Sequence, residues 1–258
     1  MKRDGAYAHL ARYYEYLCDD CDYERWSQYF VCLLREGLCG GGANNSAPCS
    51  LQGKKGIDFG CGSGVFTRAL ARVGCKMTGV DISAEMLSVA EKKTREEGLG
   101  ATYLLGDISR FKGIEKYDFA LAANDVLNYV PKEKLVLAIK RAAAALNTGG
   151  VFVFDISSKN KFLNKIDQKV SADDRDDLTY ISFGKVLGDV ATLDVTLFLR
   201  REDGAFTRYD ELHTQFVYEE SEIVSALTLA GFNVLSVTGL YGEDKSAADR
   251  VCFLAKKK

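Results

Sequence analysis

The stretch that most constrains the fold is residues 54–64, in which an apolar run from Gly56 to Phe59 is followed by alternating glycines at Gly60, Gly62 and Gly64. Glycine allows a sharp turn at positive φ and lets a ligand approach the backbone closely. The free N–H groups at the start of the helix expected next suit a polar or anionic ligand group. A strand, a glycine turn and a helix open a doubly wound α/β sheet, whose ligands bind at the carboxyl ends of the strands.

The glycine spacing narrows the class of ligand. A dinucleotide fingerprint requires the pattern G-x-G-x-x-G, whereas here the sixth position is Val65 and Gly64 comes one place early. Asp58 places a carboxylate inside the apolar strand, where it is costly unless it is hydrogen-bonded, and the amides of the turn are its expected partners. An NAD(P)-dependent oxidoreductase is therefore the disfavoured alternative.

Strand and helix patterns alternate through the next hundred residues. Helical periodicity separates runs of strand character, which lie at Cys75–Val80, Ala101–Leu105, Tyr117–Ala123 and Val151–Phe154. Ser83 is placed to cap the helix that follows the first of these runs. This alternation predicts a parallel sheet.

Polar residues end the successive strands, at Asp81, Asp107, Asn124 and Asp155. All four are expected at the carboxyl rim of the sheet, where ligands bind. Asp81 lies about 20 residues past the glycine turn, where an acid can accept hydrogen bonds from both ribose hydroxyls. Dinucleotide-binding enzymes also bind ribose through an acid at this position. Asp81 therefore indicates that the ligand contains a ribose, but it does not identify the cofactor. Asp155 is equally consistent with a simple turn former.

Residues 157–215 interrupt the alternation. Three strand-like runs separated by hairpin signals follow a polar segment with a charge run expected to be solvated, and they lie at Leu178–Leu187, Thr192–Arg201 and Phe206–Tyr218. We expect an antiparallel insertion that covers the rim as a lid or substrate wall. In the last run Glu211 and His213 are two residues apart and so share one face of the strand. Either Glu211 orients His213 or both face solvent.

Residues 5–38 carry apolar and aromatic side chains at helical spacing and predict two helices with a break near Cys18 to Asp22, and a Gly/Asn/Ser-rich linker follows at 39–53. Cys18 and Cys21 have CxxC spacing. A zinc site needs four well-placed ligands, and no second pair completes the set, so no metal site is predicted. The sequence leaves open whether this pair has a redox role.

Composition argues against nucleic acid and membrane surfaces as partners. The chain has 258 residues, of which 47% are hydrophobic and 27% charged, and a formal net charge of −2. These values are ordinary for a globular protein and give no electrostatic footprint for nucleic acid or an anionic membrane. No apolar run is long enough to span a bilayer, and the first residues contain no apolar signal region. We therefore predict a cytoplasmic protein, monomeric or homodimeric.

Several segments together resemble a known family. Ile57–Gly64 is similar to the cofactor signature of class I S-adenosylmethionine (SAM)-dependent methyltransferases, and residues 11–26 resemble the leader helices of their small-molecule subgroup. Gly106–Ile108 resembles the segment whose acid contacts the adenine amino group. Asn124–Tyr129 resembles the segment that borders the methyl group and the acceptor, and Leu229–Phe232 resembles the family's late helix-to-strand turn.

The resemblance implies an α/β fold with a doubly wound, mostly parallel, seven-stranded Rossmann-like sheet, N-terminal helices and the antiparallel insertion. Residues 54–156 and 216–258 would bind SAM, residues 1–38 would lie over the cofactor site, and residues 157–215 would form the lid. The implied cofactor-binding residues are Tyr14, Trp26, Asp58, Gly60, Cys61, Gly62, Gly64, Asp81, Ile82, Met86, Gly106, Asp107, Ile108, Asn124 and Asn128. For Tyr14 and Trp26, plain core packing is an equal alternative.

The implied reaction is methyl transfer from SAM to a nitrogen or oxygen of a small molecule, with S-adenosylhomocysteine (SAH) as product. His213 is the first candidate for a base or orienting group, because histidine exchanges protons near neutral pH, and Tyr129 and Asp125 are second. The segment after the fourth strand lacks the Asn/Asp-Pro-Pro-Tyr/Phe motif of many nucleic-acid methyltransferases. An RNA- or tRNA-modifying enzyme and a non-catalytic SAM-binding regulator remain alternatives.

Overall fold

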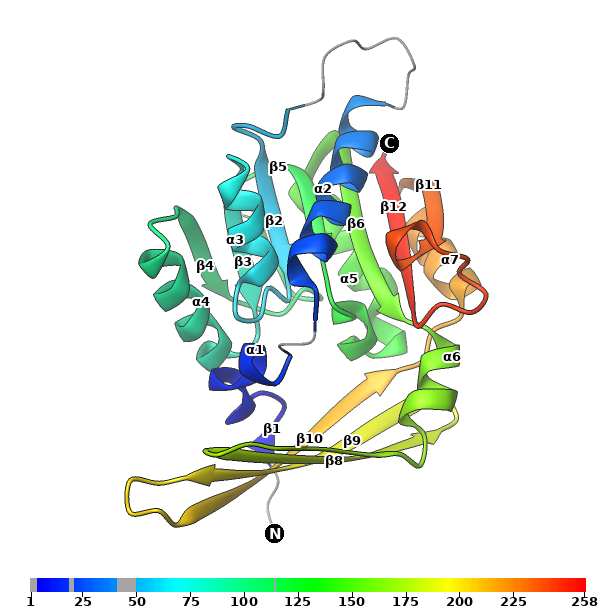
Figure 1. The fold of residues 1–258 in the computed structure, drawn as a ribbon. Helices are drawn as coiled ribbons and strands as arrows, with labels where there is room; N and C mark the ends of the chain where they lie inside the picture. The colour runs from blue at the N-terminus through cyan, green and yellow to red at the C-terminus, as the bar shows by residue number, and fades with distance from the viewer. Residues whose placement is uncertain (1–3, 19–20, 41–49, 114) are drawn as a thin grey trace.

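The computed structural model describes residues 4–18, 21–40, 50–113 and 115–258. They form two β-sheets: a larger one flanked by helices, and a smaller one that lies below the carboxyl ends of the larger sheet's strands (Figure 1). No helix in these ranges combines the length and the apolar character needed to cross a membrane.

The larger sheet has seven strands in the order β11-β12-β6-β5-β2-β3-β4. Their bounds are β2 Lys55–Phe59, β3 Lys76–Asp81, β4 Ala101–Leu105, β5 Tyr117–Ala122, β6 Leu146–Ser157, β11 Phe232–Gly239 and β12 Arg250–Lys257. Pairing is parallel throughout except at β12, which runs antiparallel to both of its neighbours. This arrangement confirms the predicted fold class.

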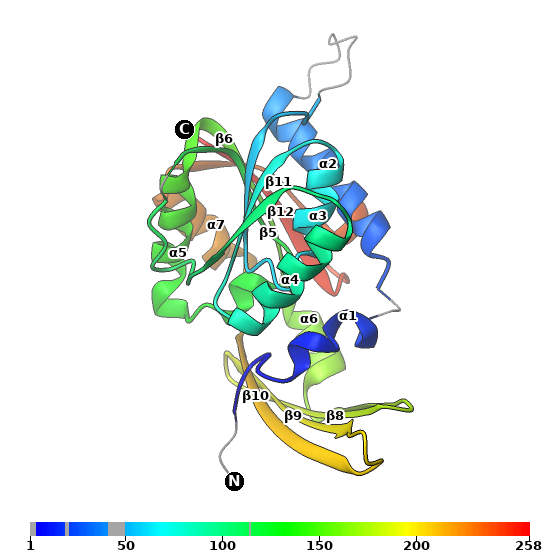
Figure 2. The ribbon, with the colours of Figure 1, turned by 90° about the vertical axis from the view of Figure 1, so that its left-hand side faces the viewer.

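Helices cover both faces of this sheet (Figure 2). One face carries α2 (Tyr23–Cys39), α3 (Val65–Arg72) and α4 (Ala84–Glu96), and the other carries α5 (Lys132–Ala145) and α7 (Glu220–Leu229). Ser83 caps α4 as expected, since its hydroxyl accepts the Met86 N–H at 3.2 Å. The apolar stripes of these helices bury side chains such as Phe30 and Ile139 against the sheet, and each buried side chain of this size contributes about 1.5–3 kcal/mol.

The chain order creates a crevice in the middle of the sheet. From β2 the chain builds outward through β3 to β4, and it then crosses back to place β5 on the other side of β2. The loops that leave the carboxyl ends of β2 and β5 therefore diverge. Ligands of open α/β sheets bind at such a switch point.

The smaller sheet has five strands in the order β1-β10-β9-β8-β7. They are β1 Asp4–Gly5, β7 Val170–Asp174, β8 Leu178–Leu187, β9 Val190–Arg200 and β10 Phe206–Phe216. The three predicted strands are present, and two more were missed. β7 occupies part of the polar segment that we expected to be solvated, and β1 pairs in parallel with β10. The backbone N–H and C=O groups at a strand edge can pair whatever the charge of the side chains. The polar sequence pattern therefore gave no signal for these two strands.

The N-terminal leader is less helical before residue 18 than its periodicity predicts. It forms a short 3-10 turn, η1 (Leu10–Arg12), and one turn of helix, α1 (Tyr14–Leu17). Glu15 anchors α1 to the larger sheet's helices through ion pairs with Arg68 at 3.3 Å and Lys93 at 2.6 Å. The leader is thereby held between the two sheets (Figure 1).

Candidate functional site

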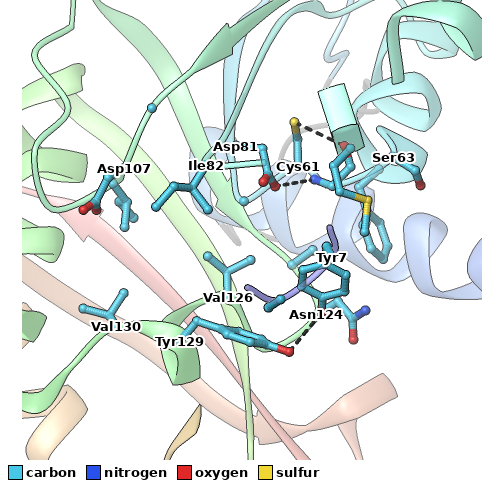
Figure 3. A pocket seen from close by; sticks show the side chains of 18 of the residues that line it. Tyr7, Cys61, Ser63, Asp81, Ile82, Asp107, Asn124, Val126, Tyr129 and Val130 are labelled. Atoms are coloured by element: carbon cyan, nitrogen blue, oxygen red, sulfur yellow. Dashed lines mark hydrogen bonds between the residues drawn. The ribbon is translucent and has the colours of Figure 1, made fainter. Parts of the chain in front are cut away.

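A first cavity of about 240 Å³ lies at the switch point. Its walls come from the leader, the glycine turn and the loops after β3, β4 and β5, and Figure 3 shows how their side chains surround it. The lining residues are Ala6, Tyr7, Tyr14, Tyr23, Gly60, Cys61, Gly62, Ser63, Val65, Phe66, Asp81, Ile82, Met86, Gly106, Asp107, Ile108, Ser109, Ala123, Asn124, Val126, Tyr129, Val130, Pro131 and Lys134.

The glycine turn shapes the floor of this cavity. A Cβ atom on Gly60 would lie 2.4 Å from the Val126 side chain, so glycine is required where the loops after β2 and β5 meet. A Cβ on Gly62 would meet nothing closer than the Met86 sulfur at 4.0 Å, which leaves the backbone open to a ligand. Gly64, with φ of 81°, begins α3 and does not line the cavity.

Asp81 presents a carboxylate to the first cavity from the end of β3 (Figure 3). Its two oxygens accept the N–H of Gly62 at 2.8 Å and the N–H of Ser83 at 2.9 Å. These bonds fix the orientation of the carboxylate, which keeps further lone pairs for a ligand. The carboxylate, the open backbone at Gly62 and the apolar walls fit a nucleoside with free ribose hydroxyls.

The remaining rim residues give the first cavity both apolar and polar walls. Gly106, Asp107 and Ile108 line the cavity after β4, and one Asp107 oxygen accepts the Ser109 N–H at 2.7 Å. Met86 and Cys61 are buried in the wall, whereas Ile82 is 75% exposed beside the opening. An exposed isoleucine at a cavity edge supplies an apolar surface for a flat ligand group.

Asp58 lines neither cavity, and the prediction that amides of the glycine turn bond to its carboxylate is wrong. The carboxylate is fully buried behind the glycine turn and accepts the Thr67 hydroxyl of α3 at 2.6 Å, while the turn amide of Gly62 bonds to Asp81 instead. Burial, opposed by hydrogen bonds from Thr67, raises the pKa of Asp58 to about 7. Asp58 thus joins β2 to α3 and supports the turn from behind.

This pKa predicts a pH-dependent contribution to stability. Because the folded-state pKa of Asp58 lies above the ordinary value of 3.8, the native state holds a proton that the unfolded chain releases. The contribution of Asp58 is most favourable below pH 4 and is lost as the pH rises through about 7, by up to about 4 kcal/mol. Urea unfolding of wild type and Asp58→Asn at pH 5 and pH 8 measures it. We expect the variant to lose less stability over this range; equal losses would contradict the assignment.

A left-handed turn follows β5. Asn124 and Asp125 have φ values of 63° and 56°, which non-glycine residues rarely adopt. Asp155 holds the turn by accepting the Asn124 N–H at 2.7 Å and the Asp125 N–H at 3.1 Å. Arg250 completes the cluster, because it donates to Asp155 at 2.7 Å and to the Asn124 side chain. Asp155 is therefore more than a turn former, since it positions a strained loop at the cavity edge.

A second cavity, of about 660 Å³, lies between the carboxyl rim and the smaller sheet. Its lining includes Asp125, Lys161, Tyr180, His213 and Gln215. Four residues line both cavities, and they are Tyr7, Tyr14, Asn124 and Tyr129. These four side chains therefore mark the boundary across which a group could pass from one ligand to another.

A chain of hydrogen bonds leads from this boundary into the smaller sheet. The Tyr7 and Tyr129 hydroxyls lie 2.9 Å apart, Tyr129 lies 3.4 Å from His213 Nδ1, and His213 Nε2 lies 3.0 Å from Glu211. Hydrogen bonds from His213 and from the leader backbone lower the pKa of Glu211, although burial opposes them. The ionised Glu211 accepts a hydrogen bond from the Nε2–H group, which leaves Nδ1 as the acceptor that faces Tyr129 and the cavity.

Glu211 also ties the leader to the smaller sheet. Besides His213, its carboxylate accepts the N–H groups of Tyr7 at 2.9 Å, His9 at 2.5 Å and Leu10 at 2.9 Å. Both Glu211 and His213 are buried, so the alternative in which they face solvent is wrong. The same carboxylate orients the histidine and holds Tyr7 at the boundary.

The structure places three other sequence candidates away from the first cavity. Asp125 lines the second cavity, where it accepts the Ser157 hydroxyl at 2.7 Å. Asn128 lines neither cavity, because its buried amide bridges the backbones of Ser157 and Phe216. Trp26 also lines neither; it packs in the core on α2, with the Arg250 guanidinium 4.7 Å above its ring.

Tyr7 and Tyr23 are lining residues that the sequence analysis missed. Tyr23 belongs to the same aromatic segment as Trp26, and the helical phase alone does not say which ring faces the cavity. Tyr7 lies within the periodic segment, but its helical spacing does not predict the contacts with Glu211 of β10 and with Tyr129 that place it at the cavity. Cys18 and Cys21 line the second cavity, and the described ranges contain no group of three or more potential metal ligands.

Comparison with known proteins agrees with this geometry. Residues 57–150 match the model of a family described as a methyltransferase domain. A protein of Geobacillus sp. (strain WCH70) that bears a methyltransferase name is 28% identical over 97% of this chain and 99% of its own length. The crystal structure of a SAM-dependent methyltransferase from Clostridium acetobutylicum ATCC 824 superposes with a TM-score of 0.82 at 27% identity, over 97% of both chains.

The chain is a class I SAM-dependent methyltransferase. It shares its fold with the sugar N-methyltransferase KedS8 from Streptoalloteichus sp ATCC 53650, which is 18% identical with a TM-score of 0.78 over 100% of this chain and 95% of that one. The methyltransferase uses SAM as its cofactor, and the resemblance drawn from its motifs is confirmed.

Proposed function

We propose that this methyltransferase transfers the SAM methyl group to a nitrogen or oxygen of a small molecule bound in the second cavity. The observation that carries the proposal is the meeting of the two cavities at Tyr7, Tyr14, Asn124 and Tyr129. The second cavity has a volume typical of small-molecule sites, roughly 300–1,000 Å³. The named activity of the structural neighbour KedS8, N-methylation of a sugar, is of this class.

In this proposal the first cavity holds the cofactor. Asp81 would accept hydrogen bonds from the ribose hydroxyls, Asp107 would accept one from the adenine amino group, and Ile82 and Ile108 would supply apolar surface for the adenine ring. Gly60, Cys61 and Gly62 would contribute the glycine turn that lines this cavity. Bound SAM supplies an activated methyl on a sulfonium, and Tyr7 and Tyr129 place aromatic and hydroxyl groups where that positive charge would lie.

The protein's part in the reaction is to align the acceptor and to remove its proton. The smaller sheet and the leader cover the rim, so the acceptor is held near the methyl and away from bulk water. His213 Nδ1, oriented by Glu211, faces the second cavity and accepts a proton from the acceptor directly or through Tyr129. Asp125 helps to position the acceptor from the rim side. A cytoplasmic location and a monomer or homodimer remain predictions from composition.

Asp81 provides a direct test of cofactor placement. Asp81→Ala removes a charged acceptor for two hydroxyls, each bond worth about 1.5–3 kcal/mol, so we expect SAM and SAH affinity to fall at least a hundredfold. Isothermal titration calorimetry measures both affinities. Asp107→Ala should weaken binding less, because it removes one contact at a half-buried side chain. An Asp81→Ala protein that is folded and binds SAM normally would refute this placement.

The acceptor class is tested by methyl transfer from radiolabelled SAM. We expect label in a small-molecule fraction when the enzyme meets separate pools of amines, alcohols and sugars, and none in a transfer-RNA pool. Label recovered only in RNA would overturn the proposal and favour the RNA-modifying alternative. His213→Ala, for which we expect a lower kcat, serves as the low-activity comparison, because His213 does not line the cofactor cavity.

A further inference from the structure

The walls of the second cavity carry an excess of positive charge. Among the described residues, five cationic side chains line it, namely Lys161, Lys165, Lys169, Arg175 and Arg250, against two carboxylates, Asp125 and Asp173. The chain as a whole has a net charge of −2, so this concentration of cations is local. Cations in a cavity with low-dielectric walls raise the local concentration of anionic ligands.

The inner cations are already neutralised by the protein. Arg250 donates to Asp155 at 2.7 Å, and its side chain is only 16% exposed. Lys161 lies 3.9 Å from Asp125 and 3.0 Å from the Ser157 hydroxyl, and it is 22% exposed. These groups lie next to the boundary tyrosines. The reacting end of the cavity therefore presents balanced charge together with tyrosine and histidine, which suits a neutral nucleophile.

The outer cations are more available. Lys161 and Lys165 lie on the turn formed by α6 (Lys159–Lys161) and η3 (Phe162–Ile166), Lys169 follows the end of η3, and all three line the cavity. Lys165 is 63% exposed and pairs with Asp249, an exposed contact of a kind worth about 0–1 kcal/mol. Lys169 is exposed and forms no ion pair within the described ranges.

We propose that the methyl acceptor carries an anionic group, a carboxylate or a phosphate, that binds Lys165 and Lys169 at the outer end of the second cavity. Its nucleophilic atom then lies at the boundary near Tyr129 and His213. The inference rests on the proposed function, since it assigns the acceptor to the second cavity. Arg175 at the same wall is held by Asp173 at 2.7 Å, so Lys169 is the main specificity-determining residue.

The test uses simple anions as probes. Pyrophosphate and citrate are titrated by calorimetry into the full-length protein saturated with SAH. We expect one of them to bind the wild type, with affinity that falls as salt rises, and to bind Lys169→Ala about tenfold more weakly. Preference for pyrophosphate indicates a phosphate-bearing acceptor, and preference for citrate indicates a carboxylate.

Lys159→Ala is the matched control. Lys159 lies on the same helical turn but pairs with Glu219 outside the cavity, so its removal should leave anion binding unchanged. No binding of either anion by wild type, or equal losses in the two variants, would overturn the inference. SAH affinity and methyl transfer to small-molecule pools are measured separately. Transfer to neutral acceptors, with a KM that is unchanged in Lys169→Ala, would refute only the anionic group of the acceptor. Transfer only to RNA would refute the proposed function.

Discussion

Replacing His213 with alanine should lower kcat by about 10²–10⁴-fold, the usual contribution of a positioned general base. His213 Nδ1 lies 3.4 Å from the Tyr129 hydroxyl at the boundary between the cavities, and the Glu211 carboxylate accepts a hydrogen bond from Nε2. SAM affinity should stay at the wild-type value, because His213 lines the second cavity and not the first. Single-turnover methyl transfer and calorimetric titration of SAM measure the two quantities separately.

The other histidine of the chain is the matched control. His9 stacks on Tyr209 and pairs with Asp4 at 3.0 Å, and it lines neither cavity. We expect His9→Ala to retain wild-type turnover. If His213→Ala also retained wild-type turnover with every acceptor methylated, the acceptor would need no base, and His213 would have only a packing role.

Asp155→Ala should destabilise the fold by about 3–5 kcal/mol, the range observed when one partner of a buried ion pair is removed. The substitution leaves the Arg250 guanidinium without its 2.7 Å partner and strips the acceptors from the N–H groups of Asn124 and Asp125. The strained turn between the cavities should then relax, so SAM affinity should fall as well. Urea unfolding gives the free-energy change.

A double-variant comparison separates the charge from the backbone contacts. Asp155→Asn combined with Arg250→Gln removes both charges but keeps a carbonyl acceptor for the turn. We expect it to be more stable than Asp155→Asn alone, because the uncompensated buried cation is gone. A loss below about 1 kcal/mol in Asp155→Ala would mean that the turn and Arg250 find other partners, contrary to the geometry.

Local patterns were sufficient to predict the larger sheet. Strand and helix periods alternate over short spans, so Gly60, Gly62 and the polar residues that end β3, β4 and β5 could be placed on one rim before any contact was known. Asp81 and Asp107 line the first cavity as expected from their positions. The same alternation predicts parallel pairing, because parallel strands need crossover helices, whereas the strand order and the switch point come from the tertiary structure.

Contacts between segments that lie far apart in the sequence determine which side chains line the two cavities. Tyr7 meets Tyr129 across 122 residues, and Glu211 meets the leader backbone across more than 200. Asp58, Trp26 and Asn128 do not face a ligand cavity, because another group of the protein contacts each of these side chains instead. The sequence by itself determined the parallel part of the larger sheet and the cofactor rim, since both depend on local periodicity and turn chemistry. Only the tertiary structure decided the second cavity, its cations and the His213 pair, because packing of the smaller sheet against the rim creates them.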